Sequence, residues 1–143
     1  MTQTMRNETG ACLVAFTPDG GRAAQTAWVF PRAFTGFQGH FPGHPVCPGV
    51  CVVLAQLAAA ERLAGAGLEL VEIESAKFTW PVFPERRVEG RLRAEPAGAP
   101  GEALWRVRAV LTRGERGVAK IQLLARAGDS AGGGAGAPGK EAP

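Results

Sequence analysis

The chain has 143 residues, of which 45% are apolar, and it carries a formal net charge of +3 with a pI near 9.1. This size and composition suit one domain with a single hydrophobic core. The arginines alternate with glutamates, so the charge favours a solvated surface over a nucleic-acid interface. Three cysteines (Cys12, Cys47 and Cys51) are too few, and odd in number, for a secreted disulfide scaffold, and reduced thiols are expected.

The two ends of the chain are expected to lie outside the folded domain. Residues 1–10 are polar and are predicted to form a flexible N-terminus, and residues 128–143 are rich in Gly, Ala and Pro and are predicted to form a disordered tail. The domain is therefore expected over residues 11–127. The most apolar window, residues 50–63, is too short to cross a bilayer, so we expect a soluble, cytoplasmic protein without a membrane partner.

Two strands are predicted at the start of the domain. Residues 11–16 are apolar, and residues 22–30 combine apolar and polar positions in a way that suits a strand. Residues 17–21 between them contain Pro, Asp and Gly, which favour a hairpin turn. We therefore expect an antiparallel pair.

A stiff loop then leads directly into an apolar helix. Three prolines between residues 42 and 48 fix φ around His40 and His44, so the loop is rigid before any tertiary packing. Residues 49–64 include only three strongly polar side chains, and a helix that is apolar nearly all round must be buried. Gly65 is predicted to end it. Its amino end, with free amides and a positive dipole, follows the histidine loop.

Four strands are predicted after the helix, because apolar and polar residues alternate there. The alternation changes parity near Glu74 or Ser75, which indicates a β-bulge. Two strands, one buried helix and four strands, with no second helix to cover a parallel sheet, predict an α+β fold with an antiparallel sheet. The alternating segments are residues 71–80, 88–94, 105–111 and 118–127.

The loop and the helix start carry a family signature. Residues 40–50 read His-Phe-Pro-x-x-Pro-Val-x-Pro-Gly-Val, which resembles the signature of the hot-dog-fold 3-hydroxyacyl-[acyl-carrier-protein] dehydratases of fatty acid synthesis. Residues 76–84, Ala-Lys-Phe-Thr-Trp-Pro-Val-Phe-Pro, are similar to one strand of that family, and residues 118–125 resemble its last strand. The resemblance implies the hot-dog fold, in which an antiparallel sheet wraps around one long central helix.

The same resemblance implies a catalytic site between two subunits whose sheets join edge to edge. His40 would be the base that takes the proton α to a thioester carbonyl, while amides at the helix start would stabilise the enolate-like oxygen. The acyl group would be carried by acyl carrier protein or coenzyme A, and dehydration needs no cofactor. The residues expected to contact the substrate are Phe41, Pro48, Gly49, Val50, Val53, Leu54 and Leu57.

One position departs from the family pattern. Family members carry Glu or Asp fourteen residues after the histidine, and this position is Leu54, which cannot supply a proton. Glu61 lies about 10.5 Å further along the helix, and Gln56 points about 200° away. Three hypotheses remain: a slow or rerouted dehydratase of fatty acid or related lipid or polyketide biosynthesis, a non-catalytic acyl-thioester binder, or one half of a heterodimer with a complete dehydratase. An acyl thioesterase ranks lower, because such enzymes commonly use a helix carboxylate.

Two other patterns receive weaker interpretations. Four metal-ligand side chains lie within twelve positions of one another, but the prolines and the unusual spacing argue against zinc, and no metal is predicted. His44 is expected to form hydrogen bonds within its own loop. A short basic group could steer an acidic acyl carrier protein. The metal-ligand side chains are His40, His44, Cys47 and Cys51, and the basic group is Arg86, Arg87 and Arg91.

Overall fold

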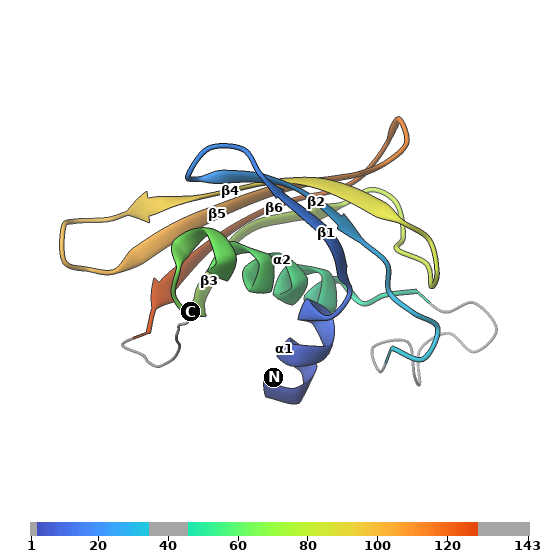
Figure 1. Cartoon of the computed structure of the whole chain (residues 1–143), viewed down its shortest axis with the longest axis horizontal. Helices are drawn as coiled ribbons and strands as arrows, with labels where there is room; N and C mark the ends of the chain where they lie inside the picture. Colours follow the sequence, from blue (N-terminus) through green and yellow to red (C-terminus); the bar gives the residue numbers. More distant parts are fainter. Residues whose placement is uncertain (1–2, 35–45, 129–143) are drawn as a thin grey trace.

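A six-stranded antiparallel sheet curves over one long helix, α2 (Gly49–Ala64) (Figure 1). This computed structural model describes residues 3–34 and 46–128. The strands lie in the order β1-β2-β4-β5-β6-β3, and the predicted α+β arrangement of a sheet wrapped around a central helix is confirmed. The strands are β1 (Leu13–Pro18), β2 (Ala23–Trp28), β3 (Leu68–Phe78), β4 (Val88–Ala97), β5 (Leu104–Arg113) and β6 (Arg116–Ala127).

Helix α2 begins and ends where the sequence predicts. It starts after Pro48 and stops at Gly65, which has a left-handed backbone conformation (φ 69°) and donates its amide to the Glu61 carbonyl oxygen at 2.9 Å. The helix packs against the concave face of the sheet, where alternate side chains of β6 are buried as expected. These side chains are Ala119, Ile121, Leu123 and Ala125.

Strand β3 lies at one edge of the sheet and contains two irregularities. Its register against β6 shifts between Ile73 and Ser75, which confirms the predicted bulge, and it also shifts between Leu70 and Glu72. The two extra residues keep the apolar side chains of β3 opposite the concave-face residues of β6. The paired residues are Leu70 with Ala125, Ile73 with Leu123, Ala76 with Ile121 and Phe78 with Ala119.

The N-terminal segment differs from the expectation. Residues Gln3–Gly10, expected to be flexible, form helix α1, which lies on the side of α2 away from the sheet (Figure 1). Gly10 is close to α2, since a Cβ built there would lie 3.7 Å from the Ala58 Cβ. The sequence of α1 is mostly polar, and the helix packs against α2.

The last strand lies at the other end of the described residues. Strand β6 ends at Ala127, and the Gly128 amide donates to the Gly67 carbonyl oxygen at 2.9 Å. The remainder of the predicted tail, residues 129–143, lies outside the described residues. Neither helix among residues 3–34 and 46–128 has the length and apolar character needed to span a membrane.

Candidate functional site

An apolar pocket of about 470 Å³ opens at the amino end of α2. One wall comes from the segment that enters the helix, and the other from the end of β3 and the residues after it. The lining residues are Val46, Cys47, Pro48, Gly49, Val52, Phe78, Thr79, Trp80, Pro81 and Val82. The pocket therefore joins two segments that are about thirty positions apart in the chain and that both belong to the motifs of the sequence.

Gly49 lets the two walls approach each other. A Cβ at this position would lie 3.0 Å from Cε2 of Phe78, closer than most Cβ atoms tolerate. Trp80 continues the aromatic wall, and the Arg116 guanidinium lies 4.0 Å from the centroid of its ring. A side chain larger than hydrogen at position 49 would displace Phe78 and narrow the pocket.

The helix start, with its first backbone amides, lies beside this pocket. The amides of Cys51 and Val52 donate to the Pro48 carbonyl oxygen at 3.0 and 3.3 Å, whereas the amides of Gly49 and Val50 have no acceptor among the described residues. The first amides of a helix also carry the positive end of its dipole. This end of α2 can therefore stabilise an oxygen atom on which negative charge develops.

The thiols near the pocket are protonated at neutral pH. Burial raises the pKa of Cys47, and the neighbouring Cys51 raises it further. Burial also raises the pKa of Cys51, and it raises that of Cys12 to about 11. A thiolate is the form that attacks electrophiles and binds metal ions, so these cysteines are poorly suited to either role. No cluster of three or more metal-ligating side chains occurs in the described part of the chain.

The predicted site residues fall into three groups. His40 and Phe41, together with His44, lie outside the described residues. Pro48 and Gly49 line the pocket. The remaining helix residues do not line it. Val50 is 47% exposed, whereas the other three are buried along α2: Val53, Leu54 and Leu57.

The basic residues predicted to steer a carrier protein lie away from the pocket lining. Arg86, Arg87 and Arg91 are exposed, and Arg87 forms an ion pair with Glu89 at 3.5 Å. Arg87 and Arg91 line a separate hollow of about 400 Å³ next to the β1–β2 hairpin. The pocket and the basic group are therefore two separate surface features.

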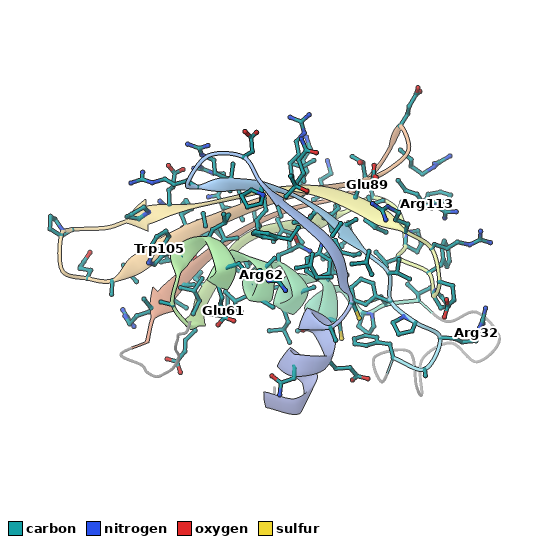
Figure 2. The ribbon with its side chains drawn as sticks, viewed as in Figure 1. Arg32, Glu61, Arg62, Glu89, Trp105 and Arg113 are labelled. Carbon is teal, nitrogen blue, oxygen red and sulfur yellow. The ribbon has the colours of Figure 1, made fainter. Side chains whose placement is uncertain are left out.

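No carboxylate lines the pocket among the described residues. Leu54 is buried at the position where the family carries its acid. The Glu61 carboxylate accepts the Leu68 amide at 2.7 Å and so caps the start of β3 (Figure 2). Gln56 is 1% exposed, and its Oε1 has no partner in residues 3–34 and 46–128.

The sequence did not identify the second wall of the pocket. The sequence predicts a strand and its end here and indicates no site role for the residues of that wall, which are Phe78, Thr79, Trp80 and Val82. The Pro-Val-x-Pro pattern at residues 81–84 was the available signal, because it marks a fixed backbone after the strand. Its contact with the start of α2 requires the folded chain.

Known proteins resemble this chain in sequence and in fold. The family described as "ApeI-like: ApeI dehydratase" matches residues 18–110. The 3-hydroxyacyl-[acyl-carrier-protein] dehydratase FabZ of Roseobacter denitrificans is 35% identical over 98 residues, which cover 62% of this chain and 64% of the relative. The FabZ of Thermus thermophilus is 38% identical over 98 residues, which cover 62% and 67%. The chain thus spans about two thirds of the length of these curated relatives.

Solved structures support the fold. A chain of "The Dehydratase Heterocomplex ApeI:P from Xenorhabdus doucetiae" matches with a TM-score of 0.62 and 19% identity, covering 80% of this chain and 96% of that chain. Cj0977, a virulence protein of Campylobacter jejuni, matches with a TM-score of 0.63 and 11% identity, covering 88% and 97%. Because the family match covers more than half of the sequence, this hot-dog protein belongs to the ApeI-like dehydratase family.

Proposed function

We propose that the chain is a dehydratase-type subunit that acts on 3-hydroxyacyl thioesters in fatty acid biosynthesis or a related lipid or polyketide pathway. The observation that carries this proposal is the apolar pocket at the start of α2, beside two amides without an acceptor among the described residues. An acyl chain suits the pocket, and a thioester carbonyl suits the amides. The names of the curated FabZ relatives support the same reaction.

In the proposed reaction, His40 takes the proton from the carbon α to the thioester carbonyl. The amides of Gly49 and Val50 hold the negative charge that develops on the carbonyl oxygen. The β-hydroxyl group then leaves as water after it receives a proton, and the enoyl thioester remains. Leu54 cannot donate that proton, so in a homodimer it passes from the His40 imidazolium through a water molecule, and the rate is low.

A dimer is part of this proposal. Strand β3 is one edge of the sheet, and its apolar side chains lie opposite the concave-face residues of β6 but stay partly exposed. Leu70, Ile73 and Phe78 are 36%, 44% and 43% exposed. Pairing of β3 with the same strand of a second subunit would satisfy its free backbone groups and cover this apolar row. The active site would then lie near the boundary between the two subunits.

A second candidate function is that of a non-catalytic partner or acyl-thioester binder. The observation that favours it is the buried leucine at position 54 together with a pocket lining that contains no carboxylate among the described residues. A complete dehydratase subunit could supply the missing acid to His40 across the dimer boundary. The dehydratase heterocomplex among the similar structures supports pairing with a second subunit, since that structure is described as a complex of unlike chains.

The carrier and compartment belong to the same proposal. Arg86, Arg87 and Arg91 would attract an acidic acyl carrier protein by their charge, and coenzyme A remains the other carrier. We propose that the chain acts in the cytoplasm, and its three buried free cysteines suit such a reducing compartment.

The test is an assay with a 3-hydroxyacyl thioester on the wild type, His40→Ala and Leu54→Glu. Formation of an enoyl product that His40→Ala abolishes would support the dehydratase, whereas release of free thiol would indicate a thioesterase. Since one positioned acid is typically worth ~10²–10⁴ in rate, Leu54→Glu should raise turnover within that range. If no enoyl product forms with any variant, alone or mixed with a complete homologue, the proposal is wrong.

A further inference from the structure

Two arginines of the hairpin between β5 and β6 lie opposite each other. Arg113 at the end of β5 pairs with Arg116 at the start of β6, so their side chains leave the hairpin on the same face. Like charges at directly opposite positions destabilise a pair of strands. Glu115 lies between them in the turn, but neither arginine forms an ion pair with a carboxylate among residues 3–34 and 46–128.

The other two arginines of β5 have acidic partners. Arg106 contacts the Glu74 carboxylate at 2.9 Å. Arg108 contacts the Glu95 carboxylate at 3.1 Å. The hairpin therefore differs from the rest of its own strand, because it holds two neighbouring positive charges that the described part of the chain does not pair.

The base of this hairpin is hydrogen-bonded to one wall of the apolar pocket. The Thr79 hydroxyl donates to the Gly117 carbonyl oxygen at 2.9 Å. The amides of Thr79 and Trp80 donate to the Val118 carbonyl oxygen at 2.9 and 3.3 Å. Since Thr79 and Trp80 line the pocket, these bonds hold Arg116, the residue before Gly117, at a fixed place beside it.

The pocket has a buried end and an open end. Val52, on the first turns of α2, is 1% exposed, whereas Trp80 is 36% exposed. Gly49, whose amide has no acceptor among the described residues, also lines the pocket. A ligand whose apolar chain reaches Val52 and whose carbonyl group meets the Gly49 amide would therefore leave the pocket past Trp80.

Arg116 lies at this open end. Its guanidinium is 4.0 Å from the centroid of the Trp80 ring. Contact with an aromatic face holds the planar guanidinium in place and leaves the N–H groups at its edge available as donors. Paired N–H donors of this kind suit the oxygens of a phosphate group.

We propose that Arg113 and Arg116, beside the Trp80 indole, bind the phosphate group of a 4′-phosphopantetheine arm at the mouth of the pocket. The proposal rests on the proposed function, in which the acyl group is carried by acyl carrier protein or coenzyme A. Both carriers hold the thioester at one end of this arm and have a phosphate at its other end. The phosphate therefore lies outside the pocket when the acyl chain lies inside.

The test uses two probes that differ only in the phosphate, hexanoyl-4′-phosphopantetheine and hexanoyl-pantetheine. Neither carries a 3-hydroxyl group, so calorimetric titration measures binding without dehydration. We expect the wild type to bind the phosphorylated probe about 10-fold more tightly, because a hydrogen bond to a charged group is typically worth at least this factor. Equal affinities for the two probes, or no binding of either, would overturn the inference.

Arg113→Met and Arg116→Met should each reduce this preference and leave the affinity for hexanoyl-pantetheine unchanged, because methionine keeps an unbranched apolar side chain. A variant that weakens both probes equally would show that the arginine only supports the pocket. Arg126→Met is the matched control. Arg126 lies near the other end of β6, beside the strand end where Figure 2 shows Trp105, and its loss should not affect the preference.

Two further ligands separate the carriers. Arg116→Met should weaken hexanoyl-coenzyme A and hexanoyl-acyl carrier protein alike, because both contain the same phosphate. Loss confined to coenzyme A would assign the arginines to its nucleotide, and loss confined to the carrier protein would assign them to the protein surface. Either result would overturn the inference.

The binding assay and the activity assay can fail independently. If the phosphate preference depends on both arginines but no 3-hydroxyacyl thioester is dehydrated, the phosphate site stands and the proposed activity fails. If the enzyme dehydrates such thioesters without any phosphate preference, the activity stands and the phosphate site is wrong.

Discussion

At the residue scale, the buried polar group of α2 stands out. Gln56 is packed among apolar side chains on the helix, and its Oε1 has no partner in the described part of the chain. A buried polar atom without a hydrogen bond costs more than a satisfied one gains. Gln56 therefore makes the folded state less stable than an apolar side chain of similar size would.

We predict that Gln56→Leu stabilises the fold. Leucine has a similar size and removes the unsatisfied atom, so the free energy of unfolding should rise by about 1–2 kcal/mol. Urea unfolding of the two proteins measures the difference. Gln122→Leu serves as the control. The Gln122 side chain donates to Glu74 and accepts from Arg108, so its loss should lower the free energy of unfolding. A drop in stability for Gln56→Leu would show that the amide has a partner, such as a bound water.

At the element scale, polar side chains tie the edge strand β3 to the rest of the sheet. The Glu74 carboxylate accepts two bonds from Arg106, both at 2.9 Å, and one from Gln122 at 2.9 Å. Arg106 and Gln122 alternate with buried residues of β5 and β6, so this cluster lies on the convex face. The bulge between Ile73 and Ser75 brings Glu74 to that face.

This cluster predicts a pH dependence of stability. The hydrogen bonds from Arg106 and Gln122 lower the pKa of Glu74 from its ordinary value of 4.5 to about 2. The charged carboxylate therefore stabilises the folded state above pH 4.5, and this contribution is lost as the pH falls through the interval down to about 2. Glu74→Gln should be less stable than the wild type at neutral pH, and the difference should shrink across that interval in urea titrations. A difference that is constant with pH would contradict the pairing.

The concave side of β3 predicts the mode of assembly. Ile73 lies in the exposed apolar row that we assign to a subunit boundary, so Ile73→Lys should convert a dimer into a monomer in sedimentation velocity experiments. Val14→Lys is the matched control, because Val14 is also exposed but lies on β1, the opposite edge of the sheet. If the dimer survives Ile73→Lys but is lost in Val14→Lys, the subunits meet at β1 and the assignment of the contact to β3 is wrong.

At the scale of the whole molecule, Leu54 makes two kinds of assembly testable. If the acid comes from a different subunit, the purified chain should be inactive, and turnover should appear when it is mixed with a complete dehydratase homologue. His40→Ala in this chain should then abolish the gain, because the one working site of such a pair uses His40. A fully active homodimer would rule this assembly out.

The parts of the fold that could be predicted are those with a strong local cause. Pro48 and Gly65 bound α2, and the change in alternation marked the bulge after Ile73. Helix α1 and the second bulge of β3 could not be predicted, because each depends on a surface built by other segments. Of the residues that line the pocket, the sequence predicts a substrate contact only for Pro48 and Gly49. The second wall of the pocket, and the hydrogen bond that the Arg32 amide donates to the Glu85 carboxylate, join residues that are far apart in sequence and carry no periodic signal.

The aromatic wall of the pocket has a practical consequence. Trp80 lines the pocket and is 36% exposed, whereas Trp28 is buried in the core. An acyl chain that displaces water from the Trp80 indole changes the polarity around that ring and leaves Trp28 unaffected. The intrinsic fluorescence of the protein therefore reports occupancy, and titration with unlabelled thioesters of increasing length can rank ligands even for a subunit that turns none of them over.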